Sequence, residues 1–110
     1  PALRLAIAAL ERDVPVAAVG EQLGLSPRRL IDVFAARVGM TPKRFARLRR
    51  FQRVLSAISG ARPPPWAELA LQCGYFDQAH LIHEFRAYSG LHPTAYAARG
   101  PGGHNHVVLD

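Results

Sequence analysis

One pattern of residues occurs twice in this chain, and this repeat limits the possible folds more than any other feature. The first copy has seven positions with counterparts 50 or 51 residues later. The pairs are Gly20 and Ala70, Gly24 and Gly74, Leu30 and Leu81, Phe34 and Phe85, Gly39 and Gly90, Pro42 and Pro93, and Phe45 and Tyr96. The offset rises by one between Gly74 and Leu81, so one residue has been added in what is predicted to be a turn. The chain therefore holds two copies of one helical unit.

Each copy shows the local signals of a helix, a tight turn and a second helix. The first helix ends at a glycine, Gly24 or Gly74, that can adopt the left-handed conformation of a C-cap. Ser26 before Pro27 in one copy, and Asp77 in the other, are residue types that cap the start of the next helix. The inward-facing pairs four residues apart are Leu30 with Phe34 and Leu81 with Phe85. This order is typical of the helix-turn-helix motif, whose second helix can lie in the major groove of DNA.

The remaining segments complete an all-α prediction. Leu3, Ala6, Ile7 and Leu10 follow helical spacing, and Thr41-Pro42 opens a linker helix that runs to about residue 59 and packs against both units. No segment shows the pattern of a long strand, and residues 107–109 are expected to be coil. We expect one domain over 1–100 with one shared core, a first helix-turn-helix at about 14–39, a linker helix at about 42–59, a second helix-turn-helix at about 66–90 and a flexible tail over 101–110.

Positive charge is concentrated in one part of the chain. The net charge is +6, and residues 26–53 contain nine basic side chains against Asp32 alone. Lys43, Arg47 and Arg50 lie on one face of the linker helix, with no acid at helical spacing to pair with them. This distribution favours a polyanionic partner. The predicted phosphate contacts are Ser26, Lys43, Arg44, Arg47 and Arg50.

Composition argues against several other classes of protein. No apolar run is long enough to span a membrane, the N-terminal segment does not resemble a signal peptide, and the single Cys73 agrees with a reducing cytoplasm. We expect Cys73 to be a buried structural thiol. His80 and His83 do not complete a metal site, nor do His104 and His106, and no nucleophile with a base is evident. We therefore expect no metal, no cofactor and no enzymatic activity.

Two segments resemble a known family. GLSPRRLIDVFAARVGMTPKRF and WAELALQCGYFDQAHLIHEFRAYSGLHPTAY are similar to the DNA-binding domain of the AraC/XylS family of bacterial transcription regulators, over about residues 14–98. The resemblance implies seven helices and binding to double-stranded promoter DNA. It also implies RNA polymerase as a partner, and a sensor or dimerisation domain, usually N-terminal, that we expect to lie outside these residues.

The same resemblance points to residues that read bases. In the first recognition helix they are Arg28, Arg29, Ile31 and Asp32, and in the second they are Gln78, Ala79, His80 and His83. Many family members have arginine at the positions of Asp32 and His83. Asp32 either accepts a hydrogen bond from a cytosine amine or orients Arg28 or Arg29. The second unit is acidic, with Glu68, Asp77 and Glu84 against Arg86, so we expect its DNA contact to be the weaker one.

The predicted function is sequence-specific binding of double-stranded DNA in the regulation of transcription. A linker helix of roughly 17 residues spans about 26 Å, and we expect the two recognition helices to read two successive major-groove segments. The alternative is a helical interaction module that binds a protein through exposed Ile31, Ile82 or Trp66. Trp66 either fills the core or faces a partner domain.

Overall fold

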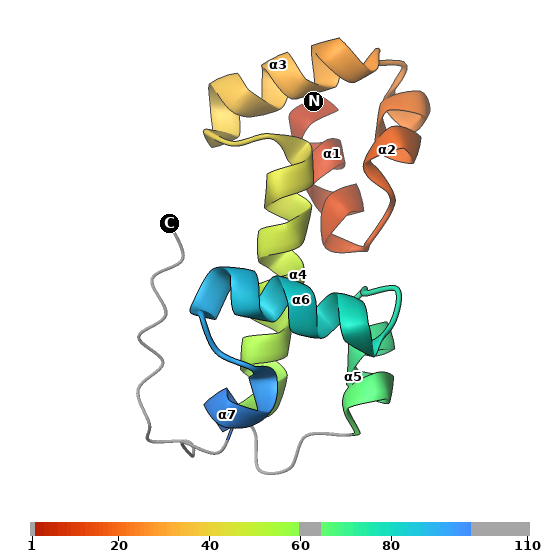
Figure 1. Cartoon of the computed structure of the whole chain (residues 1–110). Coiled ribbons are helices and arrows are strands. Elements are labelled where there is room, and N and C mark those ends of the chain that lie inside the picture. The colour runs from red at the N-terminus through yellow and green to blue at the C-terminus, as the bar shows by residue number, and fades with distance from the viewer. Residues whose placement is uncertain (1, 60–64, 98–110) are drawn as a thin grey trace. The chain divides into compact units, whose positions relative to one another are not determined.

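The computed structural model describes residues 2–59 and 65–97, and these residues form seven helices and no strand. The helices are α1 (Ala2–Glu11), α2 (Val16–Leu23), α3 (Pro27–Val38), α4 (Pro42–Ile58), α5 (Trp66–Gln72), α6 (Gln78–Ser89) and α7 (Pro93–Ala97) (Figure 1). The all-α prediction is confirmed. The predicted coil at 107–109 and the histidines at 104 and 106 lie outside the described residues.

The chain divides into two compact units, unit 1 (Pro1–Arg49) and unit 2 (Arg50–Asp110). Each unit has its own hydrophobic cluster in the described part of the chain, so the expectation of one shared core is wrong. The reason lies in the linker helix α4. Phe45 packs against the cluster of unit 1, whereas Phe51, Val54 and Ile58 are buried in the cluster of unit 2.

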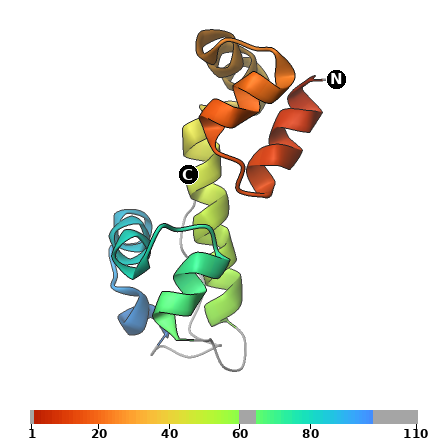
Figure 2. The same cartoon turned by 90° about the vertical axis from the view of Figure 1, so that its right-hand side faces the viewer.

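Unit 1 consists of α1, α2, α3 and the first part of α4 (Figures 1 and 2). Leu30 and Phe34 of α3 are buried, as their spacing predicts, and the edge of the Phe34 ring meets Phe45 with 5.4 Å between centroids. Gly24 ends α2 with φ of 69°, a left-handed conformation that favours glycine. The backbone turns sharply there and leads directly into α3.

Unit 2 gathers α5, α6 and α7 around the second part of α4 (Figures 1 and 2). Its core is rich in aromatic rings: Phe51 meets Phe85 edge-on at 5.1 Å and stacks on Tyr88 at 4.9 Å. Leu81 and Phe85 are fully buried, which confirms the prediction that they face inward. Cys73 is the C-cap residue of α5, and Gly74 after it has φ of 97°.

The linker helix α4 begins as the sequence predicts. The Thr41 hydroxyl accepts a hydrogen bond from the Arg44 N–H at 3.2 Å, and Pro42 is the first helical residue. Val54, in the second half of the helix, is buried completely. The helix ends at Ile58, one residue before the predicted limit.

Candidate nucleic-acid interface

The start of α3 presents two arginines to solvent. Ser26 caps the helix, its hydroxyl accepting a hydrogen bond from the Arg29 N–H at 3.1 Å, and Pro27 occupies the first helical position. Arg28 and Arg29 follow directly, and both side chains are exposed. A recognition helix contacts base edges with its N-terminal residues, so this cap places two guanidinium groups where DNA would be read.

Asp32 lies one helical turn after Arg28 and pairs with it. The distance from Arg28 Nε to Asp32 Oδ2 is 3.7 Å, and the two side chains are 87% and 57% exposed. An exposed pair of this kind contributes little to stability. Its effect is on orientation, because the carboxylate restricts where the guanidinium points. This contact agrees with the alternative in which Asp32 orients Arg28, and base reading by Asp32 stays a prediction.

Further predicted contacts of unit 1 are on the surface. Ile31 is 41% exposed on α3, and Lys43 and Arg44 are exposed in the first turn of α4. Arg47, one turn later, is half-buried. Arg49, which the sequence did not assign to the site, has a guanidinium nitrogen 3.5 Å from a carboxylate oxygen of Glu11. Basic groups therefore lie both at the start of α3 and at the start of α4.

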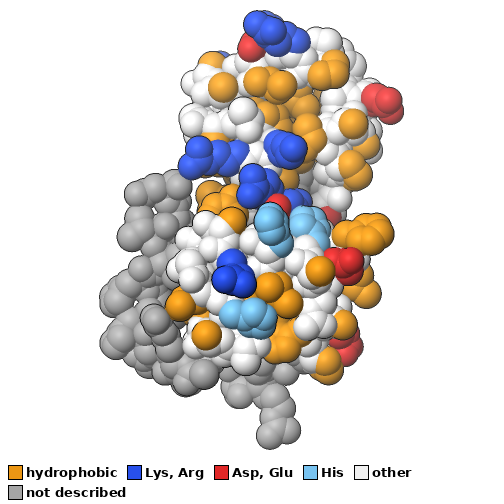
Figure 3. Space-filling model, in the orientation of Figure 1, with side chains coloured by type: hydrophobic (Ala, Val, Ile, Leu, Met, Phe, Trp, Pro, Cys, Tyr) orange, Lys and Arg blue, Asp and Glu red, His pale blue; other side chains and the backbone are white. Residues whose placement is uncertain are grey.

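In unit 2, Asp77 caps the second recognition helix. Its carboxylate accepts a hydrogen bond from the His80 N–H at 2.8 Å. Gln78, Ala79 and His83 are exposed, as base-reading residues must be. Figure 3 shows histidine side chains of unit 2, in pale blue, on the face that α6 turns toward the viewer in Figure 1.

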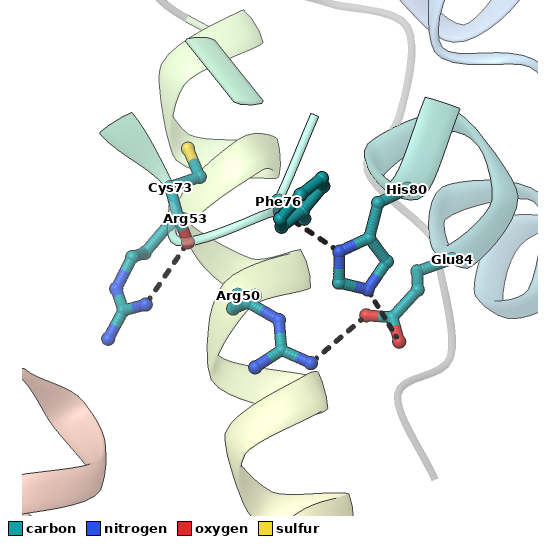
Figure 4. Close-up of polar contacts among 6 residues, drawn as sticks. All are labelled: Arg50, Arg53, Cys73, Phe76, His80 and Glu84. Carbon is teal, nitrogen blue, oxygen red and sulfur yellow. Dashed lines mark hydrogen bonds and ion pairs between the residues drawn. The ribbon is translucent and has the colours of Figure 1, made fainter. Parts of the chain in front are cut away.

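His80, the remaining predicted reader of unit 2, faces its own unit. Its Nδ1 accepts a hydrogen bond from the Phe76 N–H at 3.1 Å, and its Nε2 lies 3.5 Å from Glu84 Oε2 (Figure 4). The ring also meets Tyr75 edge-on, with 5.1 Å between centroids. Because both ring nitrogens have partners inside the unit, the structure does not favour base reading by His80.

Arg50 is also engaged within unit 2. Its guanidinium nitrogen lies 3.4 Å from Glu84 Oε1, and the two side chains are 18% and 8% exposed. The same guanidinium lies over the Tyr75 ring, 5.6 Å from its centroid. The sequence analysis found no acid at helical spacing, but the partner comes from α6. The structure therefore does not favour Arg50 as a phosphate contact, nor Glu84 as a surface acid.

The burial of Glu84 could have been predicted from its position in the sequence, although the sequence analysis did not do so. Glu84 lies between Leu81 and Phe85 on the inward face of α6. A glutamate at such a position is almost never fully buried unless it is paired, so its burial implies a cation from another element. Which cation it takes could not be found from helical spacing, because Arg50 is 34 residues away in the chain.

The end of α5 is tied to α4 by a further arginine. Arg53 donates a hydrogen bond to the carbonyl of Cys73 at 3.3 Å (Figure 4). Cys73 itself is buried and has no disulfide, which confirms the structural thiol. A cation at the last carbonyls of a helix is favourable for the helix dipole.

Trp66 and Ile82, the residues that supported a protein-interaction module, are half-buried and pack against the core of unit 2. Ile31 alone of those three residues is classed as exposed. Of the three side chains proposed to bind a protein partner, only that of Ile31 is therefore exposed.

Among the described residues, no helix is long and apolar enough to cross a membrane. The same residues contain no group of three or more histidine, cysteine, aspartate or glutamate side chains that could hold a metal ion.

The Tyr75 hydroxyl is a buried polar group whose effect on the stability of unit 2 can be measured. Its hydroxyl is buried without a hydrogen-bond partner in the described structure, and burial, followed by the Glu84 carboxylate, raises the pKa of Tyr75 above its ordinary value. Tyr75→Phe removes a polar group without a partner, so we expect the free energy of unfolding to stay unchanged or to rise by about 1 kcal/mol. Urea unfolding followed by the fluorescence of Trp66 measures it. A loss above about 1 kcal/mol would mean that the hydroxyl is hydrogen-bonded in solution.

Comparison with known proteins agrees with this architecture. A family model described as a helix-turn-helix domain matches residues 19–99. Among curated proteins, the XylDLEGF operon transcriptional activator 1 of Pseudomonas putida is 28% identical over 87 residues. That match takes in 77% of this chain and 26% of the activator, so the chain spans about a quarter of that relative's length.

Solved structures show the same fold. A transcriptional regulator of Chromobacterium violaceum, described by its AraC-type DNA-binding domain, has a TM-score of 0.74 at 19% identity, covering 90% of this chain and 91% of that one. A probable AraC family regulator of Rhodopseudomonas palustris has a TM-score of 0.70 at 25% identity, covering 89% and 95%. A xylose-binding transcription activator has a TM-score of 0.67 at 18% identity, covering 90% and 26%.

Proposed function

Because the chain belongs to the AraC-type family of helix-turn-helix DNA-binding domains, we propose that it binds specific sequences in double-stranded promoter DNA. It does so as part of a longer bacterial transcription regulator. The family is a class of regulators and not of enzymes. The observation that supports the proposal most strongly is the start of α3, where a capped helix presents the exposed side chains of Arg28 and Arg29.

Both recognition helices, α3 and α6, contact the major groove in this proposal. The base-reading residues are those whose side chains are exposed: Arg28, Arg29, Ile31, Asp32, Gln78, Ala79 and His83. Phosphates are contacted by Ser26, Lys43, Arg44 and Arg47. His80 and Arg50 hold the second unit together and do not touch DNA, because both ring nitrogens of His80 and a terminal guanidinium nitrogen of Arg50 have partners inside the protein.

The other partners follow from the same family membership. The regulator acts in the cytoplasm, where its DNA is, and it contacts RNA polymerase at the promoter. A sensor or dimerisation domain in the same longer protein controls it. The relatives support this arrangement, since one of them is described as a xylose-binding transcription activator and is matched over 26% of its length.

Selection of bound sequences from a random duplex library tests the proposal. We expect one enriched motif, and we expect Arg28→Ala to lose preference at one position of it, since a bidentate arginine–guanine contact contributes about 1–3 kcal/mol of discrimination. Arg37→Ala is the matched control, because Arg37 is an exposed arginine in the last turn of the same helix. Loss of the same preference in both variants would assign the effect to charge and not to readout.

Salt dependence separates DNA binding from the protein-interaction alternative. Displacement of counterions from phosphates makes affinity fall steeply with salt concentration. No enrichment in the selection, with weak binding to every duplex, would contradict specific recognition and favour an interaction module.

A further inference from the structure

The helix-turn-helix of unit 2 is one residue longer than that of unit 1. The hydrogen bonds of the two turns show which residue is the additional one. In unit 1 the Leu25 N–H donates to the Gly20 carbonyl at 2.9 Å. In unit 2 the Tyr75 N–H donates to the Ala70 carbonyl at the same distance, 2.9 Å. Leu25 and Tyr75 therefore hold equivalent places at the start of the two turns.

The capping residues mark the other end of each turn. Ser26 and Asp77 both accept a hydrogen bond from the N–H three residues later, at 3.1 Å and 2.8 Å. Ser26 follows Leu25 directly, whereas Phe76 stands between Tyr75 and Asp77. Phe76 is thus the residue that unit 2 has in addition, placed immediately before the cap of its recognition helix.

The side chain of Phe76 contributes nothing to the core. It is 85% exposed, the highest value among the large hydrophobic residues that the structure describes as exposed, ahead of Leu71 at 66% and Leu5 at 59%. A single exposed apolar residue is common and needs no explanation by itself. What distinguishes Phe76 is that its backbone N–H is hydrogen-bonded to a side chain of its own recognition helix, the half-buried His80.

This restraint runs from Phe76 into the interior of unit 2. The Phe76 N–H donates to His80 Nδ1 at 3.1 Å, so the ring proton is on Nε2, which faces Glu84 Oε2 at 3.5 Å. Glu84 in turn pairs with Arg50 at 3.4 Å (Figure 4). This hydrogen bond restrains the backbone of the turn before any ligand arrives, which lowers the entropy lost when the exposed Phe76 ring makes a contact.

We propose that Phe76 is a specificity-determining residue that contacts the 5-methyl group of a thymine in the major groove. The inference rests on the proposed function and names the chemical group that the start of α6 reads. Residues at the start of a recognition helix meet base edges, and an apolar side chain there recognises the thymine methyl. Gln78 and Ala79, the first two residues of α6 after the cap, are exposed as well.

Replacement of thymine by deoxyuridine tests the proposal, because it removes the methyl group and leaves base pairing intact. Each thymine of the selected site is replaced in turn, and affinity is measured for the wild type and for Phe76→Ala. For the wild type we expect affinity to fall about fourfold when one particular thymine is replaced, which is the effect of one buried methyl group. Phe76→Ala binds the thymine site about fourfold more weakly and shows no further loss with uracil.

Two control variants accompany this measurement. Phe76→Leu keeps an apolar side chain and should keep the loss with uracil. Leu71→Ala removes another exposed apolar side chain of unit 2, on α5. This variant should lose affinity at the same thymine as the wild type, and to the same extent, when uracil replaces it. Circular dichroism and thermal unfolding check that each variant is folded.

The possible results separate the two proposals. If the wild type selects no duplex at all, both the proposed function and the role of Phe76 are overturned. If it selects a site but no thymine is sensitive to uracil, or if Phe76→Ala keeps the sensitivity, only the role of Phe76 is overturned. A loss of affinity in Phe76→Ala that is equal for every duplex also overturns it, and points to a contact with sugar, phosphate or a protein.

His80 acts as a positioning residue in this proposal, and its variants test that role. His80→Ala removes the acceptor of the Phe76 N–H. We therefore expect the roughly fourfold ratio of affinities for the thymine and the uracil duplex to fall toward one. His80→Asn offers a side-chain oxygen close to the place of Nδ1 and should restore most of the ratio. A ratio that stays unchanged in His80→Ala would remove the positioning role.

Discussion

Replacing Glu84 with alanine is expected to lower the free energy of unfolding of unit 2 by about 3 kcal/mol. The Arg50 and Glu84 side chains are only 18% and 8% exposed, and their charged groups lie 3.4 Å apart. Removal of the carboxylate leaves the guanidinium of Arg50 without its counter-charge in a place where water cannot fully solvate it. Such an uncompensated charge costs far more than the loss of a surface ion pair.

Urea unfolding followed by tryptophan fluorescence measures this effect, since Trp66 is the single tryptophan and packs against the core of unit 2. Glu68→Ala is the matched control, because Glu68 is an exposed acid of α5 in the same unit. The double variant Arg50→Met, Glu84→Leu should recover much of the stability, because it leaves no buried charge. If Glu84→Ala and Glu68→Ala lost equal stability, the buried pair would have no special importance.

Removing three basic side chains at the start of α4 is expected to weaken DNA binding by about 100- to 1000-fold at 0.1 M salt. The variant combines Lys43→Ala, Arg44→Ala and Arg47→Ala. Each phosphate contact on duplex DNA contributes about 0.9 to the slope of log affinity against log salt concentration, so the slope should decrease by about 2.7. The effect should be nearly the same for specific and for unrelated sequences, because phosphates are the same at every base pair.

Affinity for the selected site and for an unrelated duplex, each measured over a range of salt concentrations, checks this expectation. Arg12→Ala is the control for a simple loss of positive charge, because Arg12 is an exposed arginine after the end of α1 in the same unit. An unchanged salt slope in the triple variant would show that α4 does not contact phosphates. In that case the positive charge of this helix would act only through the overall field of the protein.

Local features of this protein were predictable from the sequence because each depends on residues close together in the chain. Ser26, Thr41 and Asp77 cap helices as their residue types and neighbours indicate. Gly24 and Gly39 take left-handed conformations that other residues adopt only with strain. The inward leucine–phenylalanine pairs of α3 and α6 follow from helical periodicity. The exposure of Arg28 and Arg29 follows from the same periodicity.

The tertiary structure alone decided the features that depend on contacts between distant residues. The sequence of α4 does not show that Arg50 faces Glu84, because that pair joins residues 34 apart. His80 was predicted to read DNA; its ring nitrogens contact Phe76 and Glu84, each four residues away, and only the three-dimensional structure shows that the side chain turns toward them.

The division into two cores was also invisible in the sequence, since one apolar face of α4 supplies both. The repeat showed that a residue had been added between Gly74 and Leu81, and only the hydrogen bonds of the two turns identified it as Phe76. Helix starts, helix ends and inward faces are therefore local properties of this chain. The pairing of its buried charges, Arg50 with Glu84, is set by packing between helices, and the extra exposed residue, Phe76, by the geometry of the second turn.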